Sequence, residues 1–108
     1  MDMVPIEIDL DVANKQEINE ESLQSFAGKV KSLMWVLFGG VPKALPVSVT
    51  GTPGQLSAFQ RSLAAEKRYM DSYKTHGLTD PQTYKNKYVL DNAVQKFETA
   101  TGLKWPFK

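Results

Sequence analysis

The sequence contains no cysteine and a single histidine. The first absence excludes disulfides, thiolate nucleophiles and every zinc site that includes cysteine, and the second excludes metal sites built from several imidazoles. The most apolar stretch, residues 33–41, has nine residues without a charge, whereas a membrane-spanning helix needs roughly 20. The N-terminus lacks the basic start of a signal peptide. We therefore expect a cytoplasmic protein with no membrane association, no metal and no cofactor.

The size and composition are those of one globular domain. The chain has 108 residues, of which 42% are hydrophobic and 23% charged, which is typical of folded proteins. A net charge of +1 gives no general attraction to nucleic acid or acidic membranes. The charge is unevenly spread, however, because residues 1–25 carry a net −6 and residues 26–108 a net +7.

Two segments have the alternating pattern of β-strands. Apolar residues at positions 6, 8, 10 and 12 alternate with Glu7, Asp9 and Asp11, which predicts a half-buried strand over residues 3–12. A shorter alternation predicts a second strand over 46–50.

Three segments have apolar residues at steps of three and four, the spacing of one helix face. Helices are predicted over residues 19–38, 53–76 and 81–101. Asn19, Thr52 and Asp80 are the expected N-caps, and Gly77 and Gly102 are the expected residues at the C-terminal ends.

The apolar stripes of the last two helices predict their buried faces. For residues 53–76 the stripe consists of Leu56, Phe59, Leu63, Met70 and Tyr73. For residues 81–101 it consists of Tyr84, Leu90, Ala93, Val94 and Phe97.

The order β-α-β-α-α predicts an α+β fold in which an antiparallel αα-hairpin packs with a short two-stranded sheet. Strands joined through a helix are expected to be parallel. Because a sheet of two strands is marginal alone, either the tail, residues 103–108, or a second copy of the chain is expected to extend it.

Six apolar side chains exceed what the amphipathic faces require. They come from the end of the first helix and from the tail: Trp35, Val36, Phe38, Leu103, Trp105 and Phe107. In one interpretation the tail folds over the first helix and buries both within one chain. In the other these residues form a protein–protein interface, where Trp and Phe are enriched.

The four tyrosines form two pairs spaced i,i+4, which would stand at matching levels of the hairpin. With the neighbouring bases they form the set Lys67, Arg68, Tyr69, Tyr73, Lys74, Tyr84, Lys85, Lys87 and Tyr88. Such residues can stack on single-stranded bases and hold phosphates. The alternative is that the tyrosines seal the hairpin while the lysines are solvated. The net charge of residues 61–87 is only +3, which favours packing.

Three other features can each be interpreted either as a functional site or as an ordinary structural feature. Glu7, Asp9 and Asp11 could bind a divalent cation, but a straight strand spaces adjacent acids about 7 Å apart, so a solvated face is favoured. The turn at 51–54 could bind an anion at a helix N-terminus, yet a capping box explains its residues. His76 follows the pattern of a cation at a helix C-terminus better than that of a general base.

Together these observations predict a non-enzymatic protein–protein interaction or assembly protein. It would self-associate as a homo-oligomer or dock on a protein partner, as an accessory protein of a virus particle or another large complex does. The alternative is a nucleic-acid-binding module that uses the tyrosines and their neighbouring bases. A small-ligand site or an enzyme would require a concave pocket around the first strand or the histidine.

Overall fold

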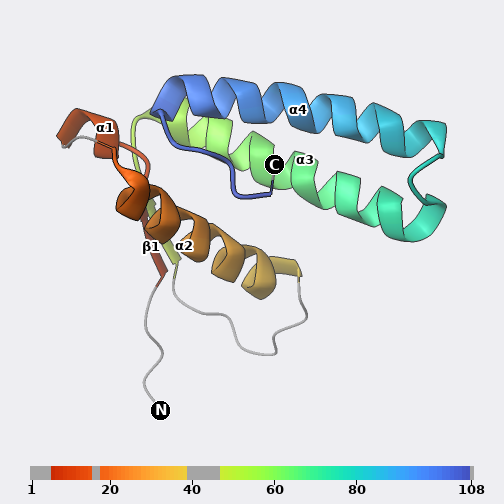
Figure 1. Cartoon of the computed structure of the whole chain (residues 1–108), viewed down its shortest axis with the longest axis horizontal. Helices are drawn as coiled ribbons and strands as arrows, with labels where there is room; N and C mark the ends of the chain where they lie inside the picture. Colours follow the sequence, from red (N-terminus) through yellow and green to blue (C-terminus); the bar gives the residue numbers. More distant parts are fainter. Residues whose placement is uncertain (1–5, 16–17, 39–46, 108) are drawn as a thin grey trace, which may run out of the picture.

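The computed structural model describes residues 6–15, 18–38 and 47–107, with the side chains at 36–38 left aside. Its elements follow the order expected for an α+β fold, with one short helix added after the first strand (Figure 1). They are β1 (Ile6–Asp9), α1 (Val12–Lys15), α2 (Glu20–Phe38), β2 (Val47–Thr50), α3 (Pro53–His76) and α4 (Pro81–Thr101). The predicted fold class is confirmed, including the antiparallel pair of long helices.

β1 and β2 form a parallel pair, with Ile6 opposite Val47 and Asp9 opposite Thr50. The first strand ends at Asp9, three residues before its predicted end. Its carboxylate explains why: Asp9 Oδ1 accepts a hydrogen bond of 2.9 Å from the backbone N–H of Asp11, a local bond that turns the chain. The short helix α1 follows directly.

The helix boundaries come from local hydrogen bonds. Thr52 accepts from the backbone N–H of Gln55 at 3.2 Å, and the Gln55 side chain accepts from the backbone N–H of Thr52 at 2.9 Å. Asp80 Oδ1 accepts from the N–H of Gln82 at 2.8 Å. At the end of α4, Gly102 has φ of 76° and donates to the carbonyl of Glu98 at 2.8 Å. A residue with a Cβ disfavours this left-handed conformation, so Gly102 is what lets the tail turn back along the hairpin.

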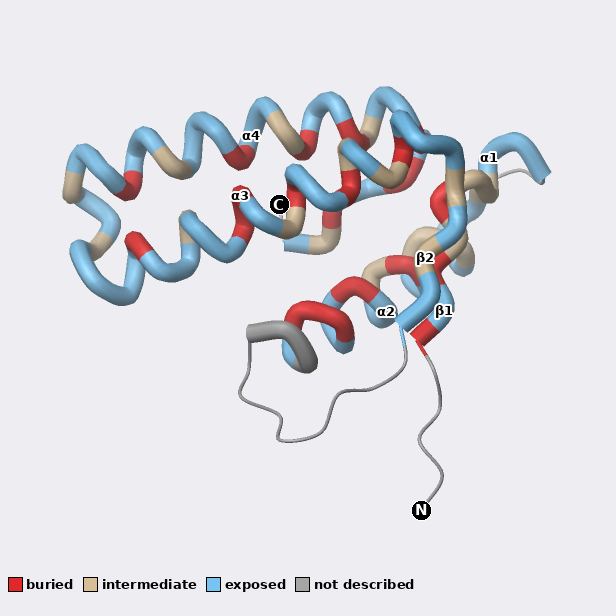
Figure 2. Tube along the Cα trace, turned by 180° about the vertical axis from the view of Figure 1, so that it is seen from behind, coloured by how far each residue is buried: buried red, intermediate tan, exposed pale blue. Residues whose placement is uncertain are grey.

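The core lies where the start of α3 and the end of α4 meet α2, β1 and the tail. Leu10, Val30 and Phe97 have no exposed area. The ring of Phe97 lies 5.8 Å from those of both Phe26 and Phe59, measured between ring centroids. Figure 2 shows buried residues concentrated at this end, whereas the end of the hairpin near the α3–α4 turn projects beyond the other elements and is mostly exposed.

The hairpin seam differs from the predicted stripes. Phe59, Leu90, Val94 and Phe97 are buried as expected, but Tyr73 and Tyr84 are 50% and 64% exposed. In their place the seam holds small polar residues: Ser62, Ser72 and Thr83. Asn86 donates from its side-chain amide to the hydroxyl of Ser72 across the seam. The prediction for the tyrosines and for Met70, 36% exposed, was wrong because small side chains let the helices pack closely and leave larger ones outside.

Candidate interaction surfaces

The tail of the chain is part of the hydrophobic core. Leu103 and Trp105 are 1% and 4% exposed. The indole of Trp105 packs on Phe59 of α3 and on Phe97 of α4, with ring centroids 6.1 and 5.4 Å away, edge to face. The tail therefore lies against the hairpin, and it shares one core with Phe26 and Val30 of the first long helix.

Two carboxylates hold Trp105 in place. Its indole Nε1–H donates to Glu66 Oε1 at 2.9 Å, and its backbone N–H donates to Glu98 Oε2 at 2.9 Å. Glu66 is only 4% exposed. Burial raises the pKa of the Glu66 carboxyl above its usual range, opposed by the Trp105 hydrogen bond and by the positive charge of Lys87. Glu66 was not singled out from the sequence, although its position seven residues after Phe59 places it on the same helix face.

Of the six residues predicted as an interface, the four whose side chains are described do not form one surface. Leu103 and Trp105 are in the core, whereas Trp35 is 65% and Phe107 40% exposed. The side chains of Val36 and Phe38 lie outside the described residues. Trp35 is thus the largest side chain of the set that remains accessible.

A second group of exposed apolar side chains lies on the projecting half of the hairpin. We call it the hairpin-tip surface: Met70, Tyr73, Leu78, Tyr84 and Tyr88, exposed by 36% to 71%. Leu78 and Tyr84 line a hollow of about 230 Å³ together with Tyr69 and Lys87. Leu78 was not singled out from the sequence, since a lone leucine in a turn carries no periodic signal.

The residues of the predicted nucleic-acid set differ in whether they form ion pairs and in where they lie on the hairpin. Lys67 pairs with Asp71 at 2.7 Å, and Lys87 pairs with Asp91 at 3.5 Å. The ammonium of Lys87 also lies 5.8 Å from the ring centroid of Tyr69, which is half-buried. Arg68 lines a different hollow from Tyr69 and Tyr84. Three of the four tyrosines do not seal the hairpin, since Tyr73, Tyr84 and Tyr88 are exposed, whereas Tyr69 packs against the core.

The remaining exposed bases of this set make no ion pair within the described ranges. They are Arg68, Lys74 and Lys85.

The acids of the first strand take part in local contacts. Asp9 pairs with Lys15 at 2.9 Å, and the hydrogen bonds from Lys15 and from the N–H of Asp11 lower the pKa of the Asp9 carboxyl. Asp11 accepts from the side-chain amides of Asn14 and Gln55 at 2.5 and 3.2 Å. Within residues 6–15, 18–38 and 47–107, no three His, Asp or Glu side chains are placed to hold a metal ion.

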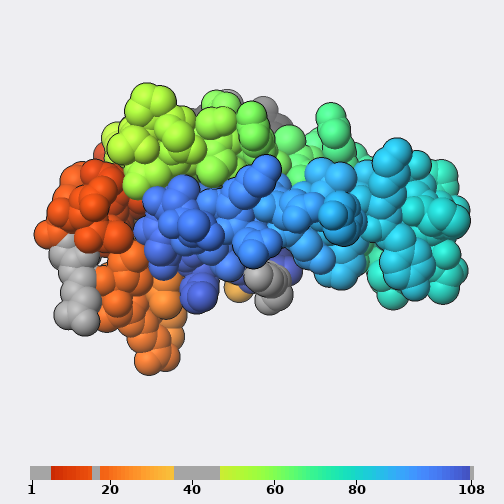
Figure 3. Space-filling model, turned by 90° about the horizontal axis from the view of Figure 1, so that it is seen from above, coloured from red at the N-terminus to blue at the C-terminus, as the bar shows by residue number. Residues whose placement is uncertain are grey.

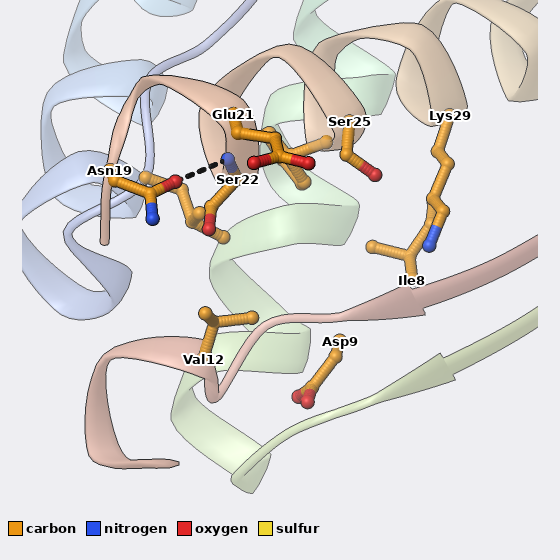
Figure 4. A pocket seen from close by; sticks show the side chains of 10 residues that line it. Ile8, Asp9, Val12, Asn19, Glu21, Ser22, Ser25 and Lys29 are labelled. Atoms are coloured by element: carbon orange, nitrogen blue, oxygen red, sulfur yellow. Dashed lines mark hydrogen bonds between the residues drawn. The ribbon is translucent and has the colours of Figure 1, made fainter. Parts of the chain in front are cut away.

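A hollow of about 500 Å³ lies between β1 and the start of α2. Figure 4 looks into it: Lys29 extends from α2 toward Ile8 of β1, and the side-chain oxygen of Asn19 accepts from the backbone N–H of Ser22 at 2.8 Å. Asn19 is therefore used as the N-cap of α2. The hollow is lined by both acids and a base, among them Asp9, Glu21 and Lys29.

The turn before α3 and the single histidine have the local structure that the sequence predicted. The Thr52–Gln55 capping box occupies the turn, and His76 is exposed in the last turn of α3.

The fold and its surfaces define a small α+β protein, and comparisons with known proteins add no closer assignment. No known protein family, curated protein or solved structure matches the chain. Among the helices of the described part, none is long and apolar enough to cross a membrane.

Proposed function

We propose that this chain is a non-enzymatic protein–protein interaction protein that self-associates or docks on a larger assembly through its hairpin-tip surface. The observation that carries the proposal is the exposure of Tyr73, Tyr84 and Tyr88, at 50%, 64% and 71%, on the half of the hairpin that projects from the core. Contiguous exposed apolar side chains on a small protein mark interaction sites, and tyrosine is enriched among the residues that dominate binding energy.

The polar seam beneath this surface supports the same proposal. Ser72, Thr83 and Asn86 fill the seam at this end, so the larger side chains have no interior to enter. They keep their apolar area available for a partner. Trp35, on α2, offers a second and separate contact. A chain with two different contact surfaces can join copies head to tail as well as in closed pairs.

The solution mass tests this proposal directly. Size-exclusion chromatography with light scattering is expected to show a dimer or larger species in slow or concentration-dependent exchange with the 12.1 kDa chain. The double variant Tyr84→Ser/Tyr88→Ser is expected to raise the dissociation constant about 30-fold, because two interface aromatics contribute about 2 kcal/mol or more.

Matched controls separate this surface from general effects of substitution. Gln95→Ser and Thr99→Ser change exposed positions of α4 outside the hairpin-tip surface and are expected to leave the mass distribution unchanged. Trp35→Ser tests the second contact. A monomer at all accessible concentrations would contradict self-association. If the Tyr84→Ser/Tyr88→Ser variant had the same mass distribution as the wild type, the hairpin-tip surface would be excluded as the interface.

Nucleic-acid binding is a second candidate, favoured by three exposed tyrosines and by Arg68, Lys74 and Lys85, which make no ion pair within the described ranges. With about three phosphate contacts on a single strand, the affinity is expected to fall about 18-fold between about 50 and 200 mM salt. Fluorescence anisotropy with a labelled single-stranded oligonucleotide measures this. Binding that does not change with salt, or its absence, would remove the candidate. The pairing of Lys67 and Lys87 with carboxylates makes it the weaker of the two.

A further inference from the structure

A shallow groove of about 390 Å³ runs between α3 and α4. Its floor and walls include Ala65, Ala93 and Val89, and its rim includes Arg61, Arg68 and Lys96. In Figure 3 the two helices are seen side by side from above, and no other described segment crosses them in this view. The groove lies apart from the hollow that Tyr84 and Leu78 line.

The rim of the groove carries charge of one sign. Arg61, Arg68 and Lys96 are exposed, and no acidic residue lines the groove. In the part of the chain that the structure describes, none of the three makes an ion pair. This contrasts with Lys67 and Lys87, each paired with an aspartate one turn further along its helix. Among the described residues, the groove therefore has three cations without an ion-pair partner.

Apart from the exposed Asn92, which also lines the groove, the side chains between the cations are small and apolar. Ala65 is buried, Ala93 is half-buried, and Val89 is 43% exposed. Small residues between two antiparallel helices let a third helix approach closely and form a three-helix arrangement. A helix carrying small apolar side chains at steps of three and four would fill the floor.

The spacing of the cations matches a helix lying along the groove. Arg61 and Arg68 are seven residues apart on α3, which is two turns or about 10.5 Å along the axis. Lys96 stands on the opposite wall, on α4. Acidic side chains on both flanks of a bound helix would reach Arg61 and Arg68 on one side and Lys96 on the other, with bidentate geometry available to each guanidinium.

We infer that this groove, defined by Arg61, Arg68 and Lys96 around an alanine and valine floor, binds an acidic amphipathic helix of a partner protein. A nucleic acid would satisfy the cations but leave the apolar floor uncovered, and no aromatic residue lines the groove for a base to stack on. A second copy of this chain offers two acids on a helix, Glu20 and Glu21 at the start of α2, but the apolar face of that helix, which includes Phe26 and Val30, is buried in its own core. This site is separate from the hairpin-tip surface and does not depend on self-association.

The test uses three synthetic peptides of about 20 residues, long enough for a helix of about 30 Å. The first has an alanine and leucine stripe flanked by glutamates, the second has lysine at each glutamate, and the third has the composition of the first in a scrambled order. We expect the full chain to bind the first peptide, and neither of the others, in a fluorescence anisotropy titration.

Charge reversal in the groove identifies the site. Arg61→Glu/Arg68→Glu is expected to weaken binding of the glutamate peptide about tenfold or more and to create binding of the lysine peptide. Lys74→Glu/Lys104→Glu makes the same change in net charge at exposed positions outside the groove and is expected to have little effect. Circular dichroism confirms that both variants remain folded.

A neutral variant tests the shape of the groove independently of its charge. Ala64 also lines the groove and is exposed, so Ala64→Phe is expected to block the helix without loss of stability. Equal weakening by both charge variants, equal binding of the scrambled peptide, or unchanged binding by Ala64→Phe would each overturn the inference. Displacement of the glutamate peptide by a single-stranded oligonucleotide at equal concentration would also overturn it, because the groove would then be a nucleic-acid site.

Discussion

Replacement of Trp105 by alanine is expected to lower the free energy of unfolding by about 3–5 kcal/mol, the range measured when large buried aromatic residues are truncated. The indole is 4% exposed and packs edge to face on Phe59 and Phe97. Its loss leaves a cavity in the centre of the aromatic cluster. It also leaves the buried carboxylate of Glu66 without the Nε1–H donor that it accepts from at 2.9 Å, which adds a desolvation cost.

The other tryptophan provides a matched control for this prediction. Trp35 is 65% exposed, so Trp35→Ala is expected to change the free energy of unfolding by less than about 0.5 kcal/mol. Urea denaturation of both variants is followed by circular dichroism. Tryptophan fluorescence would not compare them directly with the wild type, because each variant retains one tryptophan and the wild type has two. Similar losses for the two variants would mean that the tail does not occupy the core in solution.

Removal of the Glu66 side chain is expected to be the second largest effect. Glu66→Ala leaves the Trp105 indole N–H buried without an acceptor and is expected to cost about 1–3 kcal/mol of unfolding free energy. Glu66→Gln keeps an oxygen that can accept the same hydrogen bond, but carries no charge. It is therefore expected to retain most of the stability at neutral pH.

The pH dependence of the free energy of unfolding shows whether Glu66 acts as an ionisable carboxyl group or only as a hydrogen-bond acceptor. Burial raises the pKa of Glu66 in the folded chain, with Asp91 nearby also raising it and Lys87 lowering it. The folded state then binds a proton more tightly than the unfolded state. Stability therefore falls as pH rises from the usual carboxyl pKa through the raised pKa of Glu66.

The glutamine variant is the control for this titration. Glu66→Gln is expected to lack this component, so the difference in unfolding free energy between wild type and variant changes across that pH interval. A difference that is constant from acidic to neutral pH would contradict the assignment of the titration to Glu66. Glu98, which accepts from the backbone N–H of Trp105 at 2.9 Å, is unchanged in both proteins.

The features predicted correctly from the sequence are those that neighbouring residues decide. The capping box of Thr52 and Gln55, the N-caps Asn19 and Asp80, and the turn at Gly102 each depend on contacts within a few residues. The same holds for the alternation that produced β1. Its early end and the extra helix α1 depend on the carboxylates of Asp9 and Asp11 bonding to the backbone and to Asn14, a competition that apolar alternation does not reveal.

The features that were missed depend on contacts between distant parts of the chain. Tyr73 and Tyr84 fit a helical stripe as well as Ser72 and Thr83, and only the relative rotation of α3 and α4 decides which pair is buried. The position of the tail also depends on a distant contact, because Trp105 donates a hydrogen bond to Glu66, 39 residues away in the sequence. Hydrophobicity alone therefore marked Trp35 and Trp105 as equivalent, although one is exposed and the other completes the core.

The position of Trp105 in the core also determines when the protein can fold during synthesis. Phe26 and Trp105 belong to the same hydrophobic core but are 79 residues apart in the sequence. At about 5–20 residues per second, the ribosome adds Trp105 about 4–16 s after Phe26. Until then Phe26 and Phe59 are in the nascent chain without the indole that completes their cluster, and Phe97 is added only eight residues before Trp105. A chaperone that recognises exposed aromatic segments therefore has several seconds in which to bind the growing chain, and completion of the core at Trp105 ends that interval.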